Sequence, residues 1–339
     1  MDSNLLILEA TLAVVGWIIG AIMIRPIVGL ADQKPIRNSP ACDCSAVWPG
    51  RILFGLGRRC PSCSSVRPFW FVLLPLVTAV LFAGYGYALL GMETQFLAFS
   101  GTSHPIVEVR PSAFWMWGRL PYHLVLITLM IAATATDFRD YVIPDQIVIP
   151  GVICGVLFAT ISGDLQIMHL WVDWAHEVPG LHGPYIPDWI KAHPHLHGFA
   201  WSMAGLLAGS LGTWIIRFLS GLMLGEPAMG FGDVTFMAMI GSFLGWQPVV
   251  FIFLFAPACA IVFGLLIRIV IGRTFVPFGP YLALGALAVL LTWRWVWPAT
   301  RDIFGHWQSM TMLFGISTGA LVLLLGALRI YRAIPVKRT

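Results

Sequence analysis

Continuous apolar stretches of membrane-spanning length are the feature that most constrains how this chain can fold. A helix needs about 20 apolar residues to cross the hydrocarbon core of a bilayer. In chain order, the candidate stretches are residues 5–24, 70–90, 120–136, 146–161, 199–219, 234–244, 249–267, 281–297 and 310–328. Because apolar and polar residues do not alternate within them, we predict an all-α, polytopic helical membrane protein with eight or nine transmembrane helices, not a β-barrel.

The composition supports this class of protein. Of the 339 residues, 58% are hydrophobic and 11% are charged, whereas soluble domains are about 25% charged. Disordered chains and small disulfide scaffolds need other compositions. The stretch 234–244 is too short to cross a bilayer unaided, so we predict a half-helix there, followed by a turn at Trp246 and Pro248. The first stretch lacks a basic segment before it, so no cleavable signal peptide is expected.

The distribution of basic residues sets the predicted orientation. With the amino terminus outside, 15 of the 20 Lys and Arg residues fall on the inside and 5 on the outside. This excess favours nine crossings and a cytoplasmic carboxyl terminus. The basic residues are spread along the inner face, which indicates contact with anionic lipid of the bilayer and no nucleic-acid partner.

Three parts of the chain follow from this topology. Residues 1–69 hold the first span and a basic, Cys-containing cytoplasmic loop, and residues 70–290 form the membrane-embedded core. The core includes a His-rich outside loop, 163–198, which we interpret as a polar surface loop in preference to a metal site. Residues 291–339 add a further span and a cytoplasmic tail. Six tryptophans lie near the ends of predicted spans, as expected of an interfacial aromatic belt: Trp115, Trp117, Trp201, Trp293, Trp295 and Trp297.

Four cysteines of the cytoplasmic loop form two close pairs. Cys60 and Cys63 have the spacing of a zinc ribbon, whereas Cys42 and Cys44 are one residue closer than is usual. Four thiolates would make a closed, structural zinc site. Reduced free thiols, which are normal in the cytoplasm, remain the alternative.

Two aspartates at predicted span ends carry the functional argument, because ionisable groups at membrane depth are costly and usually functional. Asp137 and Asp233 both lie on the predicted cytoplasmic side. Two close carboxyl groups can hydrolyse a peptide bond, one as general base and the other as general acid. Each acidic residue of the first segment also has a simpler interpretation: a helix end near water for Asp137, a solvated loop residue or an ion pair with Arg139 for Asp140, and an N-cap for Asp145.

Three ordered motifs give this hypothesis its specificity. They are Asp-x6-Pro-Asp from Asp137 to Asp145, Gly-x-Gly-Asp from Gly230 to Asp233 with its apolar continuation, and Val-Pro-Phe-Gly-Pro-Tyr-Leu-Ala-Leu-Gly at 276–285. Over roughly residues 120–290 the chain resembles the type IV prepilin peptidases. These are aspartyl proteases of the GxGD type in the inner membrane.

The resemblance implies a set of site residues. Asp137 and Asp233 would be the catalytic pair, and Asp145 and Glu226 match acidic positions of the family's motifs. Further residues beside the site would be Gly230, Gly232, Pro277 and Gly279.

The resemblance also implies a substrate: the leader of a type IV prepilin, or of a pseudopilin of type II secretion, cut at the cytoplasmic face of the inner membrane. Proteolysis by two aspartates needs no cofactor. Many family members also methylate the new amino terminus with S-adenosylmethionine. Here the chain departs from the pattern, because Thr235 stands where many members carry Lys, and residues 20–26 do not match the usual segment after the first span. These departures favour cleavage over methyl transfer.

Two other functions use the same aspartates. A related GxGD protease would act on other membrane substrates, such as signal peptides or preflagellin-like leaders. A proton-coupled transporter would use Asp137 and Asp233 as a proton relay. A transporter would favour carboxylates near mid-span and inverted repeats, whereas these aspartates lie at span ends and no repeat is evident.

Overall fold

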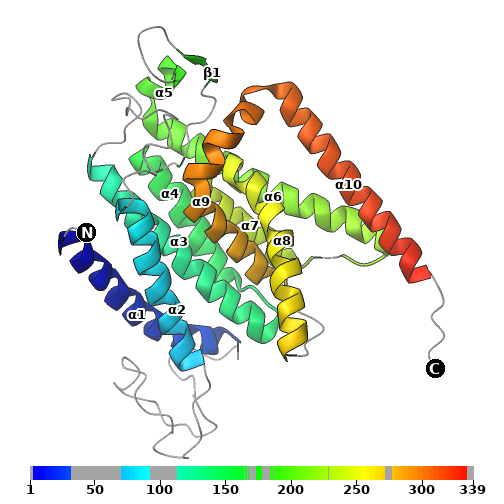
Figure 1. Cartoon of the computed structure of the whole chain (residues 1–339), viewed down its shortest axis with the longest axis horizontal. Helices are drawn as coiled ribbons and strands as arrows, with labels where there is room; N and C mark the ends of the chain where they lie inside the picture. Colours follow the sequence, from blue (N-terminus) through cyan, green and yellow to red (C-terminus); the bar gives the residue numbers. More distant parts are fainter. Residues whose placement is uncertain are drawn as a thin grey trace, which may run out of the picture.

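The fold is a bundle of helices (Figure 1). The computed structural model describes residues 3–31, 70–91, 113–163, 165, 167, 173–177, 184–185, 187–227, 229–271 and 277–333. The helices are α1 (Ser3–Ala31), α2 (Trp70–Gly86), the π-helical turn η3 (Tyr87–Gly91), α3 (Ala113–Asp140), α4 (Asp145–Ser162), α5 (Asp188–Ala192), α6 (Pro194–Leu224), α7 (Phe231–Leu244), α8 (Trp246–Ile271), α9 (Gly279–Gly305) and α10 (Trp307–Ala333). One short antiparallel pair joins β1 (Asp173–Glu177) to β2 (Pro184–Tyr185).

The predicted all-α polytopic class is confirmed. Each apolar stretch identified from the sequence is helical; the stretch 70–90 runs through α2 into η3, and each of the others lies in a helix of its own. Within the described residues, seven helices are long and apolar enough to cross a membrane. Two further apolar helical segments are shorter: α7, which has 14 residues, and the first part of α9. The short α7 agrees with the half-helix predicted at 234–244.

The turn after α7 is made by Gly245 and not, as predicted, by Trp246 and Pro248. Gly245 has a φ of 81°, in the left-handed region that glycine tolerates, and Trp246 is already the first residue of α8. Pro248 therefore lies in the first turn of α8, where the N–H that proline lacks would have no partner within the helix anyway.

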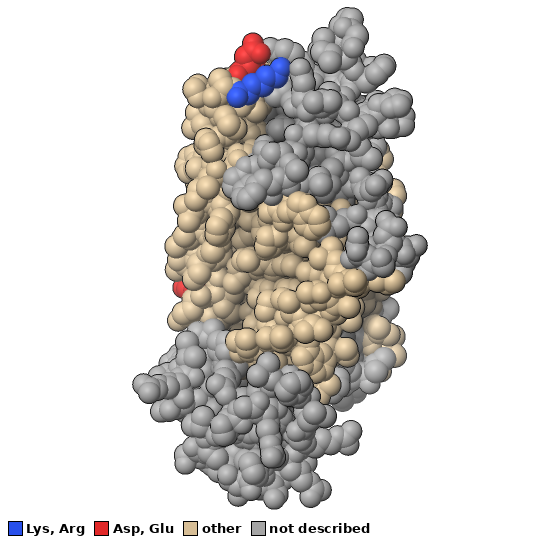
Figure 2. Space-filling model, turned by 90° about the vertical axis from the view of Figure 1, so that its left-hand side faces the viewer, with Lys and Arg blue, Asp and Glu red and all other residues tan. Residues whose placement is uncertain are grey.

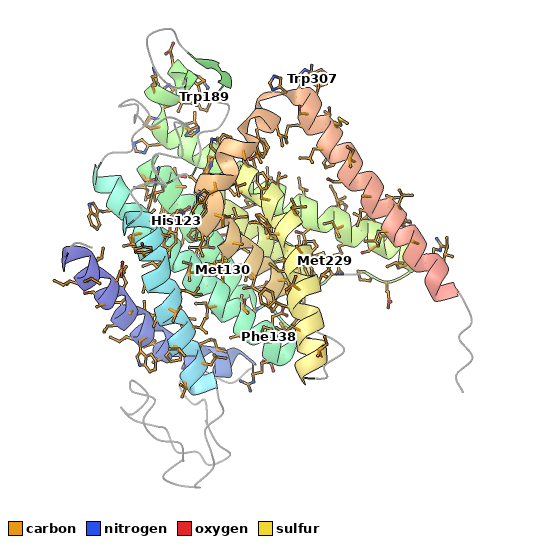
Figure 3. All side chains as sticks on the ribbon, in the orientation of Figure 1. His123, Met130, Phe138, Trp189, Met229 and Trp307 are labelled. Atoms are coloured by element: carbon orange, nitrogen blue, oxygen red, sulfur yellow. The ribbon has the colours of Figure 1, made fainter. Side chains whose placement is uncertain are left out.

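The two ends of the bundle carry different connections. In Figure 1 the α3–α4 junction lies at the lower end, while α5, the strands and the start of α6 lie at the upper end, as does the α9–α10 junction. Figure 3 places Phe138 near the lower end and both Trp189 and Trp307 at the upper end. The charge pattern predicted this separation, because it assigned the 137–145 segment and the 163–198 loop to opposite sides.

Part of the predicted 163–198 surface loop is helical. Helix α6 begins at Pro194, so His195 and His197 belong to its first two turns. The side chain of His197 is buried, and its ring lies 5.8 Å from that of Trp189. Among the described residues, no group of three His, Cys, Asp or Glu side chains could hold a metal ion.

Of the tryptophans predicted to form an interfacial belt, Trp117 and Trp295 are exposed, whereas three others lie inside the bundle. The side chains of Trp201, Trp293 and Trp297 are buried. The rings of Trp293 and Trp297 stack with centroids 5.7 Å apart, and Phe304 extends the stack from Trp297 by another 5.7 Å. A tryptophan near a span end can pack into the core as well as face lipid, and position along the span does not distinguish the two.

The outer surface matches a lipid environment. On the face shown in Figure 2, the middle of the described surface is almost free of charged side chains, and those visible lie mostly at the upper end. Large apolar side chains are exposed along α4, α6, α8 and α10. Such a surface would aggregate in water and is stable in a bilayer.

Glycines allow the central helices to touch backbone to backbone. A Cβ built on Gly205 of α6 would lie 2.0 Å from the carbonyl oxygen of Gly241 on α7, and the reverse distance is also 2.0 Å. A Cβ on Gly209 would lie 2.2 Å from the carbonyl oxygen of Met237. Small residues of this kind are the usual means of close helix packing in membranes. They fix α7 against α6.

We expect Gly205→Ala to lower the stability of the bundle, because the added methyl group must push α7 away from α6. Overpacking of this kind costs about 1–3 kcal/mol, so the melting temperature in detergent should fall by several degrees. Gly221→Ala is the matched control on the same helix, since a Cβ there meets nothing within 4 Å. Equal melting temperatures for the two variants would contradict the close contact.

Candidate active site

Asp137 lies in the last turn of α3, with its side chain only 6% exposed. The helix ends three residues later at Asp140, and the backbone N–H of Tyr141 donates to the carbonyl oxygen of Asp137 at 3.0 Å. Asp140 pairs with Arg139 at 3.8 Å, as predicted. The burial of Asp137 argues against the simpler interpretation of a helix end near water.

Asp233 lies in the first turn of α7 and is 8% exposed. Gly230 occupies the N-cap position, and its backbone N–H donates to Oδ2 of Asp233 at 2.9 Å. An acidic side chain that bonds back to the N-cap amide is half of a capping box. The positive end of the helix dipole also favours a carboxylate in this turn. The sequence therefore holds Asp233 in place locally.

The fold brings together the carboxyl groups of Asp137 and Asp233, which are 96 residues apart in the sequence. They lie close enough to interact electrostatically. The backbone N–H of Gly279 interacts with the carboxyl group of Asp137, but buried Oδ2 has no hydrogen bond of normal geometry among the described residues. Buried acceptors are nearly always satisfied, and exceptions concentrate at functional sites. Two close carboxyl groups in an apolar setting are costly to ionise together.

A glycine of α9 also bounds the site, next to Asp137. A Cβ built on Gly279, the first residue of α9, would lie 2.4 Å from Oδ2 of Asp137. Any larger residue would displace the carboxylate. The side chain of Ile143 fills the space between the two glycine positions, because it lies 3.2 Å from a Cβ on Gly232 and 3.1 Å from a Cβ on Gly279. The sequence analysis missed Ile143, although its place between Asp137 and Asp145 was a signal.

The other predicted site residues divide into two groups. Gly230, Gly232 and Gly279 lie at the aspartates or at Ile143, and Pro277 is buried two residues before Gly279. The side chains of Asp145 and Glu226 are exposed. Asp145 is the first residue of α4, and Pro144 occupies the N-cap, so the prediction of Asp145 as N-cap is wrong.

Arg217 of α6 is a second residue that the sequence analysis missed, since it entered only as a charge in the topology count. It interacts electrostatically with Asp233 and donates a hydrogen bond to the carbonyl oxygen of Met229. The four cysteines of the predicted zinc site, Cys42, Cys44, Cys60 and Cys63, lie outside the described residues. Cys154 and Cys259 are free, half-buried thiols of α4 and α8, in keeping with a packing role.

Fold and site together define a polytopic helical membrane protein with a buried aspartate pair at the ends of two helices. Sequence comparison agrees with this class. The sequence profile of the type IV leader peptidase family matches residues 185–265, a range that contains Asp233 but not Asp137. No solved structure gives a significant match to the chain.

Several characterised relatives are similar to the chain. A prepilin leader peptidase/N-methyltransferase of Aeromonas salmonicida (strain A449) is 28% identical over 202 residues, 58% of this chain and 55% of the relative. One of Pseudomonas putida is 28% identical over 203 residues, 55% of this chain and 58% of the relative. One of Burkholderia pseudomallei (strain 1026b) is 24% identical over 273 residues, 77% of this chain and 75% of the relative.

These matches make the chain similar to the type IV leader peptidase family, with the profile match confined to residues 185–265. The chain spans little more than half the length of the first two relatives. The apolar helices and the relatives together make it a multi-pass protein of the inner membrane.

We expect Asp137→Asn to raise the melting temperature at neutral pH by a few degrees. The amide keeps the shape of the side chain but carries no charge, so it removes both the burial of a carboxylate and its repulsion from Asp233. Asp140→Asn on the same helix is the control, because Asp140 lies at the exposed end of α3. Thermal unfolding in detergent measures both. A lower melting temperature for Asp137→Asn would show that its charge is stabilised, not strained.

Proposed function

We propose that this protein is a membrane-embedded aspartyl endopeptidase that removes the leader peptide from type IV prepilins or pseudopilins at the cytoplasmic face. The observation that carries the proposal is the burial of Asp137 and Asp233 side by side at the ends of α3 and α7. The family and the names of the relatives support a substrate of the prepilin class.

The pair supplies both functions that peptide hydrolysis needs. The ionised carboxylate takes a proton from water as the water oxygen attacks the scissile carbonyl carbon, and the protonated carboxyl gives its proton to the carbonyl oxygen. A tetrahedral diol results. The C–N bond then breaks as the leaving amine takes a proton and the diol returns one to the carboxylate. The pair ends with the one proton it started with.

The position of Asp137 and Asp233 suits a substrate of which one part lies in water and the other part in the membrane. A pilin precursor has a polar leader followed by an apolar helix, so its scissile bond lies where water meets the membrane. Asp137 and Asp233 lie at helix ends and not at the middle of long spans. Gly230 leaves space beside Asp233, since a Cβ built there would meet nothing closer than 3.6 Å, and an extended substrate backbone needs such space.

The alternatives make different demands. A proton-coupled transporter favours carboxylates near mid-span, whereas Asp137 and Asp233 lie in a last and a first helical turn. A GxGD protease for other substrates would use the same pair. It would differ only in which peptide it cuts.

Methyl transfer is not part of the proposal. Thr235 lies where many family members carry Lys, and its Oγ1 donates to the carbonyl oxygen of Gly232 at 3.1 Å. Lysine would extend past this acceptor and give the segment a different contact. S-adenosylmethionine is therefore needed only if the product carries a methyl group.

We expect Asp137→Asn and Asp233→Asn each to lower leader removal by about 10²–10⁴-fold, because each variant lacks one half of the acid–base pair. Purified protein in detergent is incubated with a prepilin peptide, and mass spectrometry reads both cleavage and any gain of a methyl group. Asp140→Asn is the control and should keep most of the activity.

Three results would change the assignment. Near-normal cleavage by either aspartate variant would defeat the catalytic pair. Cleavage of a signal peptide but not of prepilin would favour the related protease. No cleavage of any leader by the wild-type protein would defeat the peptidase proposal.

For Cys42, Cys44, Cys60 and Cys63 we propose a structural zinc site on their spacing alone. We expect about one zinc per chain in metal analysis of protein purified under reducing conditions. Replacing Cys60 and Cys63 with Ser should abolish the bound zinc while cleavage by the membrane core continues at a reduced rate. Absence of zinc from the wild-type protein would favour free thiols.

A further inference from the structure

The segment between α6 and α7 determines where Asp233 lies. Helix α6 ends at Leu224 and is capped by Gly225, which has a φ of 79° and whose N–H donates to the carbonyl oxygen of Gly221 at 3.0 Å. The chain then runs through Pro227 and Met229 to Gly230, the N-cap of α7. A glycine-bounded segment of this kind has little rigidity of its own. The capping bond from the Gly230 N–H ties Asp233 to this segment, so a contact that fixes the segment also fixes Asp233.

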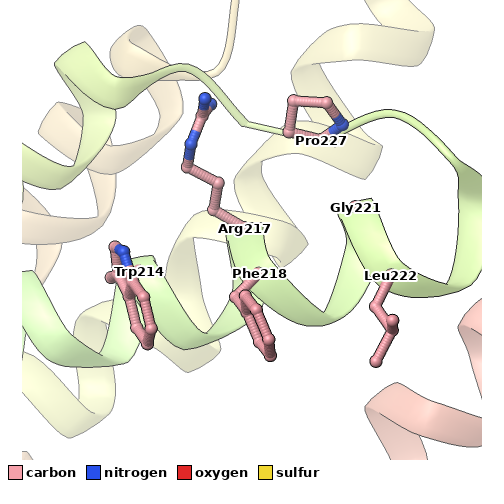
Figure 4. A pocket seen from close by; sticks show the side chains of 6 residues that line it. All are labelled: Trp214, Arg217, Phe218, Gly221, Leu222 and Pro227. Atoms are coloured by element: carbon pink, nitrogen blue, oxygen red, sulfur yellow. The ribbon is translucent and has the colours of Figure 1, made fainter.

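Arg217 supplies such a contact. Its guanidinium Nη1 donates a hydrogen bond to the carbonyl oxygen of Met229. Figure 4 shows its side chain rising from α6 toward the segment that carries Pro227. Trp214, Phe218 and Leu222 of the same helix point the other way, so Arg217 does not lie on the exposed apolar side of α6.

One peptide unit links Arg217 to Asp233. The carbonyl of Met229 and the N–H of Gly230 belong to the same planar group. Arg217 binds the oxygen of this group, and Oδ2 of Asp233 accepts from its N–H at 2.9 Å. A cation on the carbonyl oxygen polarises the peptide and strengthens the bond that its N–H donates. Rotation of the group would break both bonds at once, so each bond holds the other in place.

The charge of Arg217 acts on Asp233 in addition. The two side chains interact electrostatically, and in a membrane-embedded site such an interaction is weakly screened. The contact therefore combines an oriented hydrogen bond with a favourable field at one carboxylate of the pair.

We propose that Arg217 is a positioning residue, which fixes the Met229–Gly230 peptide and through it the carboxylate of Asp233. This inference rests on the proposed peptidase function for its kinetic consequence, but the contact itself can be tested without activity.

A groove beside Arg217 offers a competing role. Trp214, Arg217, Phe218, Gly221, Leu222 and Pro227 line a groove of about 310 Å³ (Figure 4). If the substrate's apolar helix bound there and Arg217 contacted it, loss of Arg217 would raise KM. A positioning residue instead lowers kcat, because the substrate still binds while the carboxylate is misplaced.

Three substitutions separate the parts of the contact. Arg217→Lys keeps the charge and a donor, Arg217→Gln keeps a donor alone, and Arg217→Met keeps neither. Arg329→Met is the matched control, since Arg329 is an exposed arginine of α10. Each protein is assayed with the prepilin peptide for kcat and KM. Hydrogen–deuterium exchange is measured over residues 225–233.

We expect Arg217→Met to lower kcat by about 10- to 100-fold with little change in KM, and Arg217→Lys to recover most of the loss. The amides of 225–233 should exchange about tenfold faster in Arg217→Met than in wild type. In Arg217→Met, the amides of α4 should exchange at the wild-type rate. In Arg329→Met, kcat, KM and the exchange over residues 225–233 should all equal those of the wild type.

Other outcomes overturn the inference. Unchanged exchange over 225–233 in Arg217→Met, or a higher KM at constant kcat, would rule out positioning. If Arg217→Met unfolds throughout, the same two measurements on Arg217→Lys and Arg217→Gln decide it. If wild type cleaves no prepilin, the peptidase proposal fails, and the exchange data alone decide whether Arg217 fixes the segment.

Discussion

Two carboxyl groups buried beside each other in an apolar bundle are the constraint on which the rest of the structure depends. Taking a carboxylate out of water is costly, and a second like charge nearby adds to the cost. Folding must therefore supply the energy from elsewhere. That energy comes from the large apolar surface that the other helices bury and present to lipid. The two carboxyl groups stay together because the surrounding chain permits no other arrangement.

The surrounding chain restricts the pair mainly through backbone. Gly279 presses its main chain against Asp137, and the Gly230 amide holds Asp233. Farther into the bundle, Gly205 and Gly241 set the distance between α6 and α7. Backbone contacts have few alternative positions, whereas long side chains have many rotamers. A site made in this way is held rigidly even where few polar side chains surround it.

Much of this architecture was predictable from the sequence. Apolar stretches predicted every long helix, because in lipid the backbone must satisfy its own hydrogen bonds and a helix is the simple solution. The order of three motifs predicted Asp137 and Asp233 as partners. In both cases the information is local: a run of apolar residues or a short pattern of glycine and aspartate.

Contacts between distant segments were not predictable in the same way. Ile143 fills the space between Gly232 and Gly279, which are separated from it and from each other in the chain. Arg217 looked like an ordinary inside charge. Trp201 looked like an interfacial residue, yet it is buried where a Cβ on Gly245 would lie 2.4 Å from its Nε1. The spacing of residues in the sequence indicates which residues share a face of one helix, but it says little about which other helix packs on that face.

The brevity of α7 has a consequence for how water reaches the pair. At about 1.5 Å per residue its 14 residues rise about 21 Å, against roughly 30 Å of hydrocarbon. The remaining depth has to be filled at one end, and the polar end is the one that carries Asp233. A hydrated dimple in the leaflet there would bring water down to the aspartate pair, so that a peptide bond cut by the proposed peptidase would not have to leave the membrane to meet water.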